Sequence, residues 1–117
     1  MMGARRAWLA IIALFVALAL PATAQDYPPR PAGPVYDGAN IISDGEEQLL
    51  DARLRDYNRT TGRAVIVATV PSLDDLEIEP YAQGLAETWD IGGAETENGL
   101  LFLVAPNERR MRIATAA

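Results

Sequence analysis

Two short apolar runs constrain the fold of this chain more than any other feature. They are residues 63–70 (RAVIVATV) and residues 100–105 (LLFLVA). Neither run alternates strictly between polar and apolar residues. Short runs of this kind are typical of strands that are buried on both faces. We therefore expect two central strands of one sheet, with helices covering it.

A helix is predicted before the first of these strands, over residues 44–60. Ser43 and Glu46 have the spacing of a capping box, in which the serine hydroxyl accepts a hydrogen bond from the glutamate amide. Gly62 suits the left-handed position that follows a helix. Between these ends, apolar residues recur at helical spacing, at Leu50, Leu54 and Tyr57.

A second helix is predicted between the two strands, from Pro80 to about Trp89, with Tyr81, Leu85 and Trp89 as its apolar stripe. A helix that joins two strands normally makes a right-handed crossover, so the strands should be parallel. Residues 110–115 (RMRIAT) alternate in polarity after a turn cluster, which predicts a hairpin whose last strand lies at or near an edge. These residues predict a small α/β fold with a mixed sheet.

The first 24 residues have the pattern of a secretory signal peptide. Arg5 and Arg6 precede an apolar stretch over residues 7–20, and Ala22-Thr23-Ala24 matches the A-x-A cleavage site. The apolar stretch is shorter than the ~20 residues that span a bilayer, which argues against an uncleaved anchor. We expect export and cleavage near Ala24, which would leave a periplasmic or secreted protein.

Residues 25–34 (QDYPPRPAGP) are rich in proline, which suits neither a helix nor an interior strand. We expect an extended spacer here, followed by the folded domain over residues 35–117.

Composition excludes several classes of function. Without Arg5 and Arg6, eight arginines remain against sixteen acidic residues, a net charge of −8. No nucleic-acid partner is expected, because such a partner needs a basic face. The chain also has no cysteine and no histidine. This excludes disulfides, thiolate or imidazole metal sites, and a Ser-His-Asp triad.

The candidate site residues carry carboxylate or carboxamide groups. Glu95, Glu97 and Asn98 lie just before the second strand, and Asp74 and Asp75 follow the first. Oxygen ligands of this kind suit Ca²⁺ or Mg²⁺. The loop with Glu95, Glu97 and Asn98 lacks the spacing of an EF-hand, however, and a solvated turn explains it more simply. One group precedes a strand and the other follows a parallel strand, so the two groups start at opposite ends of the strands. Topology alone therefore does not bring them into one site.

Six short motifs follow one another along the chain. They are VYDGANIIS from Val35, TGRAVIVATV from Thr61, IEPYA from Ile78, WDIG from Trp89, NGLLFLVA from Asn98 and RMRI from Arg110. Together they resemble the TPM domain family over residues 35–113. The resemblance implies an α/β/α sandwich in exported or thylakoid-lumenal domains, many of which precede a membrane segment.

The resemblance also points to individual residues. Asp37 matches the aspartate of the family's V-x-D motif, and Asn98 with Gly99 matches its N-G pair, which Glu97 precedes here. Asp37, Glu97 and Asn98 are therefore the candidate ligands for Ca²⁺ or Mg²⁺, and Asp37 is the candidate catalytic residue. After R-x-R-I the family continues with G-x-G-L-E and further helices, whereas this chain reads ATAA. We therefore expect a sandwich that is incomplete at its C-terminus.

Three functional hypotheses follow, since some family members are described as calcium binders and some as acid phosphatases. The first is a divalent-cation-dependent or non-catalytic binding module in envelope protein maintenance, with an envelope or membrane protein as its partner. The second is a metal-assisted acid phosphatase whose nucleophile is Asp37 or a metal-bound water. The third is an inactive truncated fragment.

Overall fold

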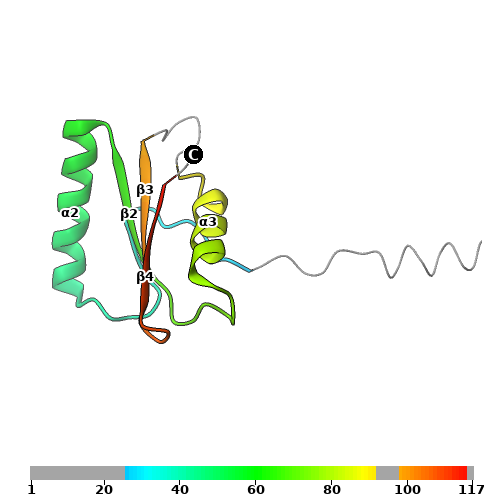
Figure 1. Cartoon of the computed structure of the whole chain (residues 1–117). Coiled ribbons are helices and arrows are strands. Elements are labelled where there is room, and N and C mark those ends of the chain that lie inside the picture. Colours follow the sequence, from blue (N-terminus) through cyan, green and yellow to red (C-terminus); the bar gives the residue numbers. More distant parts are fainter. Residues whose placement is uncertain (1–25, 92–97, 116–117) are drawn as a thin grey trace, which may run out of the picture.

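The structure is a computed structural model that describes residues 26–91 and 98–115, and these residues form three layers (Figure 1). Helix α2 (Asp44–Thr61) lies on one face of a sheet and helix α3 (Ile78–Thr88) on the other. Strands β1 (Val35–Asp37), β2 (Ala64–Thr69), β3 (Gly99–Ala105) and β4 (Arg110–Thr115) lie across the sheet in that order. The predicted α/β/α sandwich is confirmed.

The sheet is mixed, as predicted. β1 pairs with β2 and β2 with β3 in parallel, and β3 pairs with β4 in an antiparallel hairpin that leaves β4 at the edge. Val67 lies between Val35 on one side and Phe102 on the other. Paired residues point to the same face, so this register decides which side chains meet each helix.

The ends of α2 are set by the residues that the sequence indicated. The Ser43 hydroxyl accepts a hydrogen bond from the Glu46 amide at 3.3 Å. Gly62 adopts a left-handed backbone with φ of 74°, and its amide donates to the Asn58 carbonyl at 2.8 Å. No residue of α2 is buried. This helix is therefore well defined at its ends but packs shallowly on the sheet.

The core lies between α3 and the sheet. Helix α3 begins at Ile78, two residues before the predicted start, and Trp89 caps its end. The Trp89 side chain is 1 % exposed, and the Tyr36 ring packs edge-on against it at 5.6 Å between ring centroids. The other large buried side chains of this layer are Leu73, Leu85, Leu101, Leu103 and Val70. Within the described residues, neither helix is long and apolar enough to cross a bilayer.

Residues 26–34, which we call the N-terminal strap, lie against the domain instead of standing away from it (Figure 1). The Pro34 carbonyl accepts from the Val67 amide at 2.8 Å. The Pro28 carbonyl accepts from the Trp89 indole, also at 2.8 Å. Composition predicted an extended spacer for this segment, and the structure adds that its backbone is held at two points.

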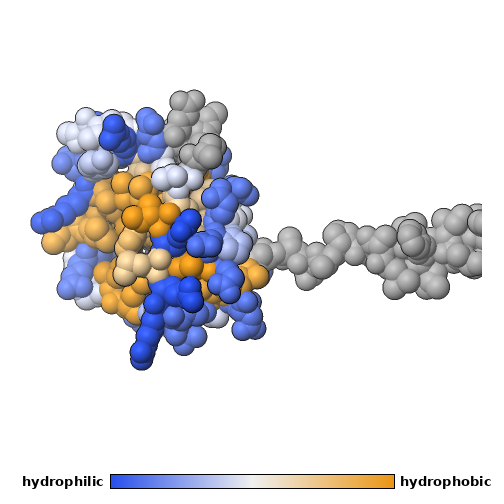
Figure 2. Space-filling view, viewed as in Figure 1, coloured by the Kyte–Doolittle hydropathy of each residue, from blue (hydrophilic) through white to orange (hydrophobic). Residues whose placement is uncertain are grey.

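The α2 side of the sheet is only partly covered. Met111 is 67 % exposed and Ile113 is 54 % exposed, and their partners across the hairpin are Val104 and Phe102. Figure 2 shows apolar surface gathered between α2 and the sheet. We call this surface, formed by Phe102, Val104, Met111 and Ile113, the open face.

Candidate functional site

The parallel pairing of β1 with β2 brings Asp37 beside Thr69. The Thr69 side chain is 1 % exposed. Its hydroxyl donates to Oδ1 of Asp37 at 2.5 Å and accepts from the Ala39 amide at 3.1 Å. A buried hydroxyl on β2 thus fixes the carboxylate at the carboxyl end of the sheet.

The loop that follows β1 closes on the same carboxylate. The Ile41 amide donates to Oδ1 at 3.1 Å and the Ile42 amide to Oδ2 at 2.9 Å. Gly38 makes this possible, because a Cβ at that position would lie only 2.8 Å from the Thr69 carbonyl oxygen. Asp37 therefore holds the loop that leads into the N-terminus of α2.

These contacts decide the charge of Asp37. Burial alone would raise the pKa of this carboxyl, but hydrogen bonds from Thr69 and from the amides of Ile42, Ile41 and Asn40 outweigh it and lower the pKa. The group is thus an ionised acceptor at neutral pH and not a general acid. The same bonds occupy most of the roughly four acceptor sites of a carboxylate, which leaves little capacity for bidentate metal binding or nucleophilic attack.

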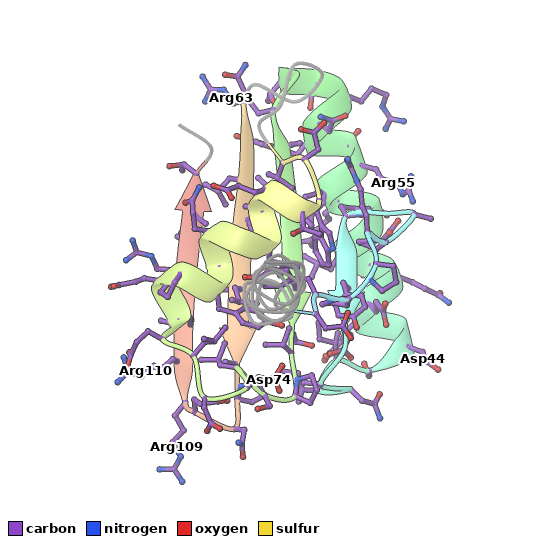
Figure 3. The ribbon with its side chains drawn as sticks, turned by 90° about the vertical axis from the view of Figure 1, so that its right-hand side faces the viewer. Asp44, Arg55, Arg63, Asp74, Arg109 and Arg110 are labelled. Atoms are coloured by element: carbon purple, nitrogen blue, oxygen red, sulfur yellow. The ribbon has the colours of Figure 1, made fainter. Side chains whose placement is uncertain are left out.

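Two further acidic residues lie at this edge of the sheet. Figure 3 shows Asp74 at the end where β2 finishes, and Arg63, which precedes β2, at the opposite end. Glu108 lies in the turn between β3 and β4, and its Oε2 accepts from the Leu73 amide at 2.7 Å. The other oxygen, Oε1, is buried and has no hydrogen-bond partner within the described part of the chain.

An aromatic pocket opens beside these acids. Burial raises the pKa of the Tyr81 hydroxyl to about 12, and the negative charge of Asp74 adds to this effect. The pocket has a volume of about 340 Å³, and its walls include Tyr27, Tyr36, Tyr81 and Asp74. Burial raises the pKa of the Tyr27 hydroxyl as well, so Tyr27 and Tyr81 can donate hydrogen bonds to a ligand at neutral pH.

The predicted ligands do not converge on one point. Asp37 is level with Thr69 and Val104 across the sheet, whereas Asn98 precedes β3. The six residues from Val104 back to Asn98 span about 20 Å along the strand. One ion cannot contact both side chains in this arrangement. Glu97 lies outside the described residues.

The remaining acids suit a cation by type but not by number. Among residues 26–91 and 98–115, no three acidic side chains lie close enough together to hold one metal ion. A cation at the Asp37 edge would depend on backbone carbonyls and water for most of its ligands, as Ca²⁺ often does.

Sequence reasoning missed Thr69 and Glu108. Thr69 lies inside an apolar run and was interpreted only as part of a strand. Glu108 lies in a sequence that signals a turn, and it was interpreted only as part of that turn. The usable signal was topological: a hairpin turn after a strand parallel to β2 lies at the edge where β2 ends, beside Asp37.

Comparison with known proteins places the chain in a family. The family model described as the TPM domain matches residues 35–117. Among solved structures, the N-terminal domain of a protein from P. gingivalis matches with 32 % identity and a TM-score of 0.64, over 69 % of this chain and 52 % of that chain.

An N-terminal domain from Corynebacterium glutamicum matches with 21 % identity and a TM-score of 0.62, over 83 % of this chain and 62 % of that chain. The match to the second structure supports the fold alone. The chain thus spans between half and two thirds of each of these two structures. No curated protein matches it.

Proposed function

This chain belongs to the TPM domain family, and on that premise we propose that it is a divalent-cation-dependent binding module that acts outside the cytoplasm. The observation that carries this proposal is Oε1 of Glu108, which is buried and has no hydrogen-bond partner among the described residues. The setting follows from the predicted signal peptide, and maintenance of envelope proteins is the role that fits it.

An unpaired carboxylate oxygen in a protein interior is costly, and such atoms normally have a partner such as a water molecule or an ion. The negative charges of Asp74 and Glu108 both act on the Tyr81 hydroxyl, which supports a cation on this side of the sheet edge. A bound cation would supply the partner that Oε1 of Glu108 lacks among the described residues.

The ligands would come from the carboxylates of Glu108 and Asp74, completed by backbone carbonyls and water. Ca²⁺ accepts such a set more readily than Mg²⁺, because its coordination is larger and more flexible. With so few carboxylates, we expect a dissociation constant in the range of extracellular calcium modules, about 10⁻⁴–10⁻³ M.

The test is calorimetric titration of Ca²⁺ into residues 25–117, together with thermal melting. We expect saturable binding and a melting temperature that rises with Ca²⁺ concentration. Glu108→Gln should weaken binding about tenfold or more, whereas Glu87→Gln, the same change at an exposed position on α3, should not. Equal binding by both variants, or none at millimolar Ca²⁺, would refute the site.

Hydrolysis is not part of the proposal, because the carboxylate of Asp37 is engaged by the loop that it holds. An aryl phosphate assay at acidic and neutral pH distinguishes the two functions. Turnover by residues 25–117 that disappears in Asp37→Asn would replace the binding module with a phosphatase.

A further inference from the structure

The N-terminal strap lies in a groove whose walls are aromatic. The Tyr27 ring meets the Tyr81 ring edge-on, with 5.1 Å between centroids. The Trp89 indole N–H donates to the Pro28 carbonyl at 2.8 Å. A Cβ at Gly84 would clash with the Tyr27 hydroxyl, so the glycine in α3 makes room for this side chain.

These contacts have the chemistry of proline-rich peptide recognition. An extended segment with several prolines has no internal hydrogen bonds and presents its carbonyls outward. Domains that bind such segments do so with aromatic grooves. Here the resident sequence is Tyr27-Pro28-Pro29-Arg30-Pro31, and an indole donor meets one of its carbonyls.

The strap does not fill the groove. The aromatic pocket of about 340 Å³ opens beside residues 26–29. A second pocket of about 220 Å³ lies beside residues 30–34, where Leu54, Val65 and Trp89 contribute to its walls. Pocket volume therefore lies along both halves of the strap, between the contacts that Tyr27, Pro28 and Pro34 make with the domain. We expect a terminal segment held in this way to open at low free-energy cost.

We propose that the surface beneath the strap is a docking groove for an extended, proline-rich segment of another polypeptide. The strap occupies this groove in the free protein, and the partner segment displaces it. The proposal does not depend on the cation site. With cleavage near Ala24, the strap would begin one residue after the new N-terminus, where it can leave the groove without unfolding the domain.

The test uses residues 25–117 and a fluorescently labelled peptide with the sequence of residues 25–34, QDYPPRPAGP, followed by anisotropy. Tyr27→Ala weakens the strap of the protein but leaves unchanged the domain residues that contact the strap, Tyr81 and Trp89. Because strap and peptide compete, we expect the Tyr27→Ala protein to bind the peptide at least about fivefold more tightly than the unsubstituted protein. Trp89 is the single tryptophan in residues 25–117, so a change in its emission reports the same event.

Two controls make the result specific. Tyr57→Ala removes an exposed tyrosine from α2 and should leave the affinity unchanged. A peptide with alanine in place of its tyrosine and first proline should bind neither protein. Dimers formed by exchange of straps would also support the groove, since each strap then binds another polypeptide. Equal peptide affinity of the unsubstituted and Tyr27→Ala proteins, or no binding to either folded protein at millimolar peptide, would overturn the proposal.

Discussion

The two faces of the sheet are built from the same strands but differ sharply in how they are covered. On β3, Leu101 and Leu103 point to the α3 side and are fully buried, while Phe102 and Val104 point to the α2 side and are only partly buried. On β4, Ala114 is buried and Ile113 is 54 % exposed. The strands are apolar on both faces, so the difference arises from the helices.

This contrast indicates which layer contributes most to the free energy of unfolding. Helix α3 packs five buried residues onto its face, while α2 contributes none. Burial of apolar area is the main favourable term in folding. The α3 layer should therefore determine the free energy of unfolding, with α2 stabilised mainly by its caps and by contacts at the sheet surface.

The largest predicted difference in unfolding free energy comes from truncating one side chain on each face of the sheet. Leu103→Ala removes a side chain that is completely buried and should lower the free energy of unfolding by about 2–5 kcal/mol. Ile113→Ala, on the open face, should lower it by less than about 1 kcal/mol. Urea denaturation of residues 25–117 measures both. Equal losses would mean that the open face is covered in solution.

Gly84→Ala and Gly45→Ala give the next largest contrast. Alanine normally stabilises a helix relative to glycine by up to about 1 kcal/mol. At Gly45, in α2, a Cβ would have no neighbour within 4 Å, so the alanine should raise the unfolding free energy by part of this amount. At Gly84, in α3, it would displace the Tyr27 ring and should cost about 1 kcal/mol instead.

Thermal melts of both glycine variants test this sign change. The Gly84→Ala protein should also bind the strap peptide with an affinity that differs from that of the unsubstituted protein, because its own strap is displaced. A stabilised Gly84→Ala protein with unchanged Trp89 emission would show that the strap does not lie over α3.

Asp37 links stability to pH. Its pKa is lower in the folded chain than in the unfolded one, so its contribution is fully present above the unfolded pKa of ~3.9 and is lost as the pH falls through the folded pKa. The difference in unfolding free energy between the unsubstituted protein and Asp37→Asn should therefore be constant above about pH 5 and shrink below it. Asp56→Asn, on exposed α2, is the matched control. A difference that persists unchanged to pH 2 would contradict the assignment.

The fold was predictable from the sequence where local signals and burial agree. The two apolar runs became β2 and β3, Ser43 and Gly62 became the caps of α2, and the alternation near the end became β4. The stripe of Leu50, Leu54 and Tyr57 was less informative, because periodicity identifies a face but not what covers it. Tyr57 is 40 % exposed since α2 meets a sheet face that is partly open.

The candidate site was less predictable, because it depends on which loops share an edge. Asp37 could be singled out, but its role in holding the loop after β1 required the register of β1 with β2. The local sequence around Glu108 indicated only a turn, and its place beside Asp37 followed only from the topology of the sheet. The proline content of residues 25–34 predicted an extended backbone and could not indicate that Trp89 would bind it.

The smallest expected change in stability concerns the open face itself. The double change Met111→Gln and Ile113→Gln replaces two exposed apolar side chains and should alter the unfolding free energy by no more than about 0.5 kcal/mol. Binding of the dye ANS, which reports exposed apolar surface, should nevertheless fall clearly. Leu76→Gln, at an exposed leucine outside this face, should leave dye binding nearly unchanged. If the double variant instead lost more than 1 kcal/mol and its oligomeric state changed, a second copy would be covering the face, and the two sides of the sheet would be equally closed.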